Sequence, residues 1–437
     1  MKAAKTQDSI DVEALRIGMF VHLDVGWMSH PFPLSSFKIT SAEQVAIIGS
    51  LGLKRVRWSP QQSDAFAVVE PTNWGAMSQL GDGPSEPVTA AVPDESPEQA
   101  AEAKARAAHR QNLADQRAAL QLCERQFSEA SKDCKQLTEL AVPKPQEARA
   151  QAEALARALL DKMLGEQELC IQLLTEAAGD KASMHALNVT IISMLMGRSF
   201  GLPEADMLDL GMGAMLHDIG KLDLPDRVRH REDHFTSGEN RFYEEHVSRG
   251  VAMARKMGLA PGAMLVLAQH HEHADGSGFP LKLNTDRMTA AARIVALVNR
   301  YDNLCNPNIA GKALTPHESL SLLFAQGKTK FDTAILGAFI KMMGVYPPGS
   351  TVQLTDDRYA MVVAVNSSRP LKPRVLVHDL KVAREEALVL DLETASGLGI
   401  RRSVRPQHLP PASLDYLSPR QRVAYFFEPA RSMALAA

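Results

Sequence analysis

The sequence holds few cysteines, few aromatic residues and little excess charge of either sign. Its four cysteines form no CxxC pair, which argues against a disulfide framework and a thiolate zinc site and favours a reducing compartment. The formal net charge is −3, whereas a DNA-binding protein needs a concentrated basic face. No apolar run approaches the roughly 18 residues that cross a bilayer, and the N-terminus lacks the apolar segment of a signal peptide. We therefore expect a cytoplasmic protein without membrane insertion and without a DNA partner.

Length and composition indicate several domains. A chain of 437 residues with 45% hydrophobic and 23% charged residues is globular and too long for one ordinary core. Changes of pattern along the chain predict a multidomain, mainly α protein with a small N-terminal α+β domain and a small C-terminal β appendage. The expected parts are a regulatory domain at 1–70, a flexible linker at 71–97, connecting helices at 98–178, a helical domain at 179–345, and the β appendage with a tail at 346–437.

The two ends of the chain carry strand patterns. Alternating apolar residues predict strands at 19–23 and 54–58 around a short helix that Ser41 caps. We interpret His22 and His30 in this region as ordinary surface or turn residues. Similar alternation near the other end predicts an antiparallel sheet. Its expected strands are 351–354, 360–365, 375–377 and 387–390.

A long helix is expected after the linker. Residues 98–140 are rich in Ala, Glu, Arg and Gln, and prolines separate them from a second helical run expected from Gln146 to about Ala178. Apolar residues recur at heptad spacing in the first run, but their companion positions are small or polar. Packing on its own domain, a homodimer through this helix and a solvated connecting helix are all open interpretations.

Histidines and one aspartate recur at helix ends between Met184 and Val345, where apolar periodicity predicts only helices. A single His-Asp pair, such as the one in Leu216–Lys221, is more often a hydrogen-bonded pair that caps a helix. Here each further candidate follows about one helix after the last, as a bundle brings side chains from successive helices to one site. Imidazoles with a carboxylate suit iron, manganese or zinc. The candidate ligands are His185, His217, Asp218, His246, His270 and His271.

These motifs together resemble the HD-GYP family, a branch of the HD phosphohydrolase superfamily. The strings that carry the resemblance are HDIGK at 217–221, the lone His246, HHE…DGSGFP at 270–280, and Arg300-Tyr301-Asp302. The N-terminal strings GMFV and GWMSHPFP resemble a domain of uncharacterised role that precedes such modules. The resemblance implies an HD-type helical bundle that binds two or three metal ions, commonly iron or manganese.

The resemblance also implies a reaction and a set of site residues. The reaction is hydrolysis of the bacterial second messenger cyclic di-GMP to linear pGpG or GMP, in which a metal-bridging hydroxide attacks phosphorus. Asp218 and Lys221 are the expected catalytic residues, and Lys221 also contacts phosphate. The expected metal ligands are His185, His217, Asp218, His246, His270, His271 and Asn299. The expected substrate contacts are Lys221, Gly278, Phe279, Pro280 and Lys312.

The chain departs from the family pattern at several of these positions. Asn299 stands where the family has an aspartate ligand, so the first metal site is expected to be looser. Asp302, three residues on, is interpreted as a structural bridge or cap. Phe279 replaces the tyrosine of Gly-Tyr-Pro, which keeps the aromatic face and loses the hydroxyl. Lys181 stands where three-metal members have glutamate, so two divalent ions are expected.

The phosphate-binding residues depart as well. Asn308 and Gly311 stand where the family has basic residues that contact the substrate phosphates, and only Lys312 keeps a charge there. Three functions are therefore weighed. The first is a phosphodiesterase acting on cyclic di-GMP, and the second is a catalytically impaired cyclic di-GMP sensor or interaction module with signalling partner proteins. The third is a phosphohydrolase of another nucleotide.

Overall fold

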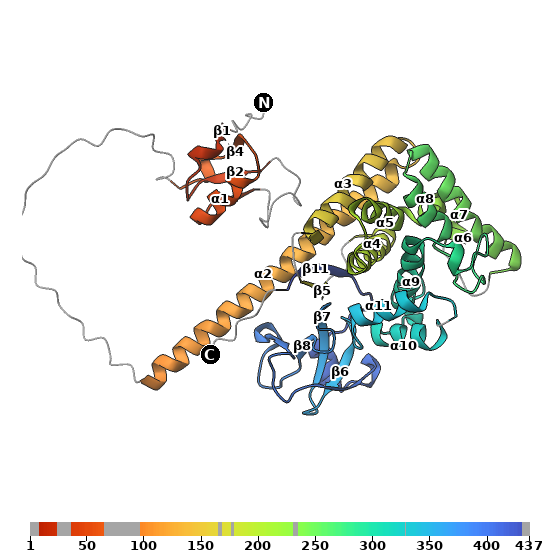
Figure 1. Ribbon diagram of the computed structural model, residues 1–437. Helices are drawn as coiled ribbons and strands as arrows, with labels where there is room; N and C mark the ends of the chain where they lie inside the picture. Colours follow the sequence, from red (N-terminus) through yellow and green to blue (C-terminus); the bar gives the residue numbers. More distant parts are fainter. Residues whose placement is uncertain are drawn as a thin grey trace, which may run out of the picture. The chain divides into compact units, whose positions relative to one another are not determined.

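Figure 1 shows the computed structural model of the chain. It describes residues 8–23, 36–64, 97–164, 168–175, 179–229, 235–327 and 329–430. The turn that holds His30 and the predicted linker, except Pro97, lie outside these residues. The chain divides into two compact units, Met1–Ala107 and Ala108–Ala437, and the five-part division predicted above stays a prediction. None of the described helices is both long enough and apolar enough to cross a membrane.

The first unit is a four-stranded antiparallel sheet with one helix. The sheet order is β1-β4-β2-β3. Its elements are β1 (Asp8–Asp11), β2 (Phe20–His22), β3 (Ser36–Lys38), α1 (Ala42–Ser50) and β4 (Arg55–Trp58). Ser41 caps α1 by accepting a hydrogen bond from the backbone N–H of Gln44, as predicted. The strands predicted at 19–23 and 54–58 are confirmed, and His22 pairs with the hydroxyl of Ser59 at 2.8 Å.

The second unit is built mainly of helices. Apolar periodicity predicted this class, and the helices begin at residues that supply caps: Asp180, Thr236 and Thr289 each accept a backbone N–H of the first turn. The longer helices are α2 (Pro97–Leu140), α3 (Pro145–Leu164), α4 (Lys181–Ser199), α5 (Glu204–Leu216), α7 (Ser237–Met257), α8 (Pro261–Gln269), α9 (Ala290–Cys305), α10 (Pro316–Gln326), α11 (Thr333–Met343) and α12 (Pro411–Leu417). The shorter ones include η5 (Ile219–Asp223), α6 (Asp226–Arg229) and η7 (Ala310–Lys312).

The two halves of α2 differ in their surroundings. In the C-terminal half Cys123, Phe127 and Leu137 are buried, and Phe127 meets Phe426 edge to face, with ring centroids 6.5 Å apart. Most described side chains between residues 101 and 120 are exposed. The C-terminal half is therefore packed in its own unit, and the other half reaches the same unit through His109 and Gln116, which pair with the backbone of Glu386 and Val389. A homodimer through α2 stays a prediction.

The helical run expected from Gln146 to Ala178 was wrong in its second part. Helix α3 ends at Leu164, and Leu169–Leu173 forms strand β5. β5 pairs with β11 on one side and β7 on the other, both more than 180 residues away in sequence. A short apolar run such as Leu-Cys-Ile-Gln-Leu is compatible with a buried helix or a buried strand, and only these distant partners decide between them.

The C-terminal strands and β5 form one seven-stranded antiparallel sheet. Its order is β10-β6-β7-β5-β11, and β8 pairs with both β7 and β9. The strands are β6 (Thr351–Leu354), β7 (Tyr359–Asn366), β8 (Arg374–Val377), β9 (Val389–Asp391), β10 (Ile400–Ser403) and β11 (Tyr425–Pro429). The four strands predicted in this region are confirmed, and β10 and β11 were not predicted. The sheet thus combines β5, which precedes α4 in the sequence, with strands that follow α11. All four cysteines are free thiols in buried positions.

Candidate metal centre

Four helices deliver the candidate ligands to one place. His185 lies in the second turn of α4, and His246 lies midway along α7. His217 is the C-cap of α5, and Asp218 follows it where the chain turns into η5. His270 is the C-cap of α8, and His271 follows it. Successive helices thus bring the candidate ligands to one place, as predicted, although His185 and His246 lie within helices and not at helix ends.

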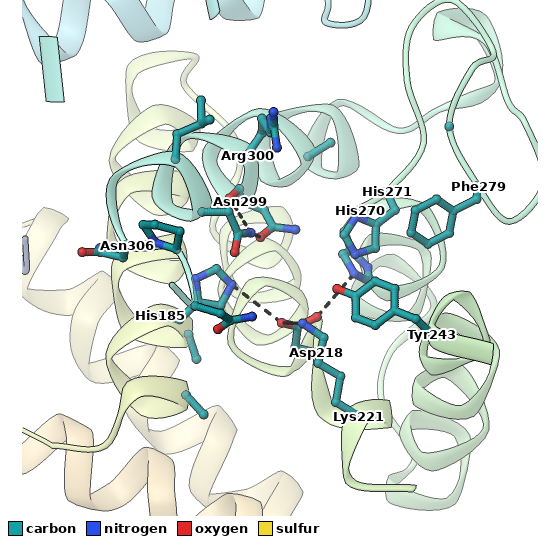
Figure 2. Close-up of a pocket in the computed structure, with 18 of the residues that line it drawn as sticks. His185, Asp218, Lys221, Tyr243, His270, His271, Phe279, Asn299, Arg300 and Asn306 are labelled. Carbon is teal, nitrogen blue, oxygen red and sulfur yellow. Dashed lines mark hydrogen bonds and ion pairs between the residues drawn. The ribbon is translucent and has the colours of Figure 1, made fainter. Parts of the chain in front are cut away.

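The structure gathers these residues into two clusters that share one carboxylate. One cluster is His185, His217 and Asp218, and the other is Asp218, His246, His270 and His271; within each, the potential ligand atoms lie within 4.8 Å of one another. Figure 2 shows Asp218 between His185 on one side and His270 and His271 on the other. Its Oδ2 lies 3.7 Å from the Nε2 of His185, and its Oδ1 lies 3.6 Å from the Nε2 of His246. Asp218 therefore has one oxygen for each cluster.

Backbone hydrogen bonds fix the tautomer of three of the histidines. The Nδ1 of His217 lies 2.6 Å from the carbonyl oxygen of Ala214, three residues earlier. His246 and His270 make the same contact, at 2.6 and 2.8 Å, with the carbonyls three residues before them. Because a carbonyl only accepts hydrogen bonds, each Nδ1 carries the proton and each Nε2 presents a lone pair.

His185 is oriented by a side chain instead. Its Nδ1 lies 2.6 Å from the Oδ2 of Asp302, a carboxylate with no exposed surface. The Nε2 of His185 then faces the Nε2 of His217 at 3.2 Å. The interpretation of Asp302 as a structural bridge is confirmed, and its contact with a candidate ligand was not foreseen.

The polar atoms at the centre fit a pair of cations. Two nitrogen lone pairs face each other at 3.2 Å in one cluster, and those of His246 and His270 face each other at 3.4 Å in the other. The Oδ1 of Asp218 and the Nε2 of His271 are buried without a hydrogen-bond partner among the described residues. Such facing lone pairs repel each other, and buried acceptors without a donor are costly. A divalent cation in each cluster removes both problems, and imidazole with carboxylate suits iron or manganese.

Burial keeps the histidines neutral. It lowers the pKa of His217 from 6.5 to about 4, and it holds the pKa values of His270 and His271 well below their usual range. Neutral imidazole is the form that binds a metal. The cluster is therefore ready to coordinate at neutral pH without first losing protons.

Asp218 and Lys221 form an ion pair beside these histidines. The Nζ of Lys221 lies 2.6 Å from the Oδ2 of Asp218 and over the ring of Tyr243, 5.3 Å from its centroid. Burial by itself would raise the pKa of Asp218, but the ammonium of Lys221 holds that pKa well below its usual range. Burial by itself would lower the pKa of Lys221, but the carboxylate raises it. Both groups are thus charged, with about a fifth of each side chain exposed.

The loop after α8 closes the second cluster. Gly278 is buried, and a Cβ there would overlap the backbone of His271, Glu272 and His273, so only glycine allows this turn. The turn places Phe279 on His271, with ring centroids 4.5 Å apart and planes 24° apart; Figure 2 shows the two rings side by side. The aromatic ring thus covers one ligand, and it also packs against the cluster of Leu224, Val228 and Tyr243.

The clusters lie at the bottom of a cleft of about 1250 Å³. The predicted residues Lys221, Gly278, Phe279 and Asn299 line it. Pro280 and Lys312 are not among the described residues that do. Asn299 is 3% exposed, and its Oδ1 accepts a hydrogen bond of 2.6 Å from the Nδ2 of Asn303. Its role as a metal ligand stays a prediction.

Several basic side chains of the cleft were missed by sequence reasoning. Among the described residues, the lining of the cleft contains six basic side chains and only two carboxylates, Asp218 and Glu244. The six are Lys181, Lys221, Arg229, Lys282, Arg300 and Lys330. Arg300 follows Asn299 directly, which was a usable signal. Lys330 comes from the loop between α10 and α11 and carries no motif.

Two protein families match this chain. The HD domain family matches residues 162–335, and a domain of unknown function (DUF3391) matches residues 7–162. The first covers both metal clusters and α9. The resemblance to the HD-GYP family drawn from the motifs is confirmed by this match together with the relatives below.

Known relatives match part of the chain. Cyclic di-GMP phosphodiesterase PA4108 of Pseudomonas aeruginosa is 28% identical over 195 residues, which are 44% of this chain and 47% of that protein. The 3'3'-cGAMP-specific phosphodiesterase 2 of Vibrio cholerae is 30% identical over 131 residues, which are 30% of this chain and 25% of that protein. The chain spans about half the length of PA4108 and less of the cGAMP enzyme. Among solved structures, Bd1817, an HDG"Y"P protein from Bdellovibrio bacteriovorus, is similar at 14% identity with a TM-score of 0.40, over 76% of this chain and 98% of that one.

Proposed function

We propose that this chain, which belongs to the HD-GYP family, is a metal-dependent phosphodiesterase that hydrolyses cyclic di-GMP to pGpG, GMP or both. The observation that carries the proposal is the position of Asp218, whose two oxygens face two separate histidine clusters. A carboxylate shared in this way is the arrangement of a two-metal hydrolase. We also propose two divalent ions, iron or manganese, as the cofactors.

The ions supply a water-derived nucleophile at neutral pH and stabilise charge on the phosphoryl oxygens when bound. The residues of the chain do the rest. Asp218 bridges the two clusters, and Asp302 holds the tautomer of His185 that points its Nε2 inward. Lys221 places a permanent positive charge next to Asp218, where developing negative charge on a phosphate is offset. No protein nucleophile is required.

The cleft above the clusters suits a doubly charged cyclic dinucleotide. Its volume of about 1250 Å³ exceeds that of an ordinary small-molecule pocket. Six basic residues against two carboxylates give it a positive lining, and the ring of Phe279 offers an aromatic face for a base. Asn308 and Gly311 are uncharged at positions where the family has basic residues. Arg300 and Lys330 supply positive charge to the cleft instead.

The test is turnover by the purified full chain loaded with Mn²⁺ or Fe²⁺. We expect linear pGpG or GMP to appear from cyclic di-GMP, and chelation to abolish it. Lys221→Met should lower kcat by about 10² to 10³ because it removes a charge at the reacting phosphate. Lys341→Met, on α11 outside this cleft, is the matched control and should leave kcat unchanged. Metal-loaded protein that binds cyclic di-GMP and releases no product contradicts the proposal and identifies the sensor function instead.

A second candidate substrate has specific support. A relative named as 3'3'-cGAMP-specific shares 30% identity over 131 residues, and an aromatic ring that lines the cleft, such as Phe279, does not by itself distinguish guanine from adenine. A panel of cyclic di-GMP, 3'3'-cGAMP and cyclic di-AMP under the same conditions separates the two, because the preferred substrate has the highest kcat/KM.

A cytoplasmic location belongs to the same proposal. The four buried free thiols suit a reducing compartment, and the proposed substrate is an intracellular messenger.

The proposal also includes partner proteins. We propose that the N-terminal unit has signalling partners and that the chain forms a homodimer through the exposed half of α2. Size-exclusion chromatography with light scattering tests the dimer.

A further inference from the structure

The C-terminal strand β11 is joined to the first metal cluster by a chain of buried hydrogen bonds. The chain begins at His185, whose Nδ1 donates to Asp302 at 2.6 Å. The other oxygen of Asp302 accepts from two side-chain amides, Asn188 on α4 at 2.8 Å and Asn306 at the end of α9 at 2.9 Å. The carboxylate therefore has three donors and no exposed surface.

The two asparagines hold β11 with their remaining groups. Both Nδ2 atoms donate their second hydrogen to the carbonyl oxygen of Val423, at 2.9 Å. The Oδ1 of Asn306 accepts from the N–H of Val423, and the Oδ1 of Asn188 accepts from the N–H of Tyr425. Each amide makes three hydrogen bonds, and both are at most 5% exposed. Figure 2 shows Asn306 on the same side of Asp218 as His185.

The network docks the start of β11 on α4 and the end of α9, because both amides bond the backbone of Val423–Tyr425. Every amide group has a partner, as a buried polar network requires. The network also supplies a fixed carboxylate beside His185. A partner that orients a histidine ligand commonly changes metal affinity 10- to 100-fold when it is lost.

We infer that Asn188 and Asn306 are positioning residues for the first metal site, and that the segment Val423–Tyr425 acts through them to hold Asp302 against His185. The inference rests on the proposed metal function, since it concerns affinity for a cation at His185, His217 and Asp218. It extends the site into a segment beyond residue 335, where the HD domain match ends.

The test measures Mn²⁺ binding to the full chain by titration calorimetry, with metal content by mass spectrometry and folding by circular dichroism. We expect Asn306→Ser and Asn188→Ser to weaken one of two Mn²⁺ sites by about tenfold or more and to leave the other within about twofold. Phe427→Leu is the matched control: this buried residue of β11 stacks on Phe426 and forms none of the network's hydrogen bonds described above. It should lower the melting temperature and leave both affinities unchanged.

A double-mutant cycle separates positioning from a general loss of packing. If the amides act through the carboxylate, Asn306→Ser should cause no further loss of Mn²⁺ affinity in an Asp302→Asn background. Additive losses, or a folded Asn306→Ser variant with two wild-type affinities, overturn the inference. Should Asn306→Ser fail to fold, the same cycle with Asn188→Ser replaces it. Because the readout is metal binding, absence of cyclic di-GMP hydrolysis contradicts the proposed function and leaves this inference standing.

Discussion

At the scale of single residues, we predict that Asn299 weakens the first metal site. Its amide lies in the cleft, 3% exposed, and is engaged by Asn303, and a neutral oxygen contributes no charge to a cation. We expect Asn299→Asp to raise Mn²⁺ affinity at one site by about tenfold and to raise turnover with it, measured by calorimetry and product release.

The matched control for this change is Asn308→Asp. It adds the same charge to the lining of the cleft, next to Lys181 and away from the clusters. It should leave metal affinity unchanged. An Asn299→Asp variant with unaltered metal affinity would show that this position does not contact a cation.

The buried histidines make the stability of the metal-free protein depend on pH. The pKa of His217 is about 4 in the folded state and 6.5 in an exposed histidine, so between these values the unfolded chain binds a proton that the folded chain does not. The free energy of unfolding is therefore largest above pH 6.5 and falls as pH falls toward 4. His270 and His271 add to the slope with the same sign.

Urea unfolding of chelator-treated protein at pH 7.5, 6 and 5 measures this dependence. His217→Gln removes one titrating group and should give a shallower slope. Mn²⁺-loaded protein should keep its stability to lower pH, because the cation competes with protons for the same nitrogens. If the free energy of unfolding falls equally steeply with pH in the wild-type protein and in His217→Gln, then His217 is not one of the groups that cause the dependence.

At the scale of elements, the contact between η5 and α7 holds the two clusters together. η5 begins directly after Asp218, and α7 carries His246. A Cβ at Gly220 would overlap the backbone oxygen of His246 and the nitrogen of Gly250. The two elements approach this closely only because residue 220 is glycine.

Gly220→Ala should therefore push η5 away from α7. We expect a loss of about 3 kcal/mol in the free energy of unfolding and weaker binding at the cluster of His246, His270 and His271. Gly337→Ala on α11 is the control, since a Cβ there meets nothing within 4 Å; it should be neutral or stabilising by up to about 1 kcal/mol. Chemical denaturation and Mn²⁺ stoichiometry are the measurements, and equal effects of the two substitutions would contradict the role of this contact.

At the scale of the whole molecule, the helical bundle and the C-terminal sheet depend on each other. β5 lies between α3 and α4, and among the described strands it pairs only with β7 and β11, which follow α11. Its residues Leu169, Cys170 and Ile171 are buried in that sheet. A chain ending at Val345 leaves this strand unpaired and removes Val423 and Tyr425, the backbone partners of the buried amides of Asn188 and Asn306.

We expect residues 97–345 to lack cooperative unfolding and to be cut readily by protease, whereas residues 97–430 should unfold cooperatively and bind two Mn²⁺ ions. The second chain is the control, because it loses only residues of the first unit and both ends. Circular dichroism during heating and limited proteolysis make the comparison. A cooperative, metal-binding 97–345 chain would show that the sheet is dispensable.

The sequence by itself determined which side chains are candidates for the chemistry of this protein. Motif spacing identified the six candidate ligands and Lys221, because metal binding needs specific atoms and few residue types provide them. Helix periodicity and cap residues identified most helices, because these signals are local. The same local signals found α1 and the strands at 20–22, 55–58 and 351–391.

Only the tertiary structure decided how distant segments meet. Whether Leu169–Leu173 is a helix or a strand depends on β7 and β11. The partner of Asp302 depends on α4, and the lining role of Lys330 depends on a loop with no motif. These outcomes depend on contacts between segments more than a hundred residues apart. The energy of such a contact depends on both segments, so the sequence of either segment alone does not reveal it.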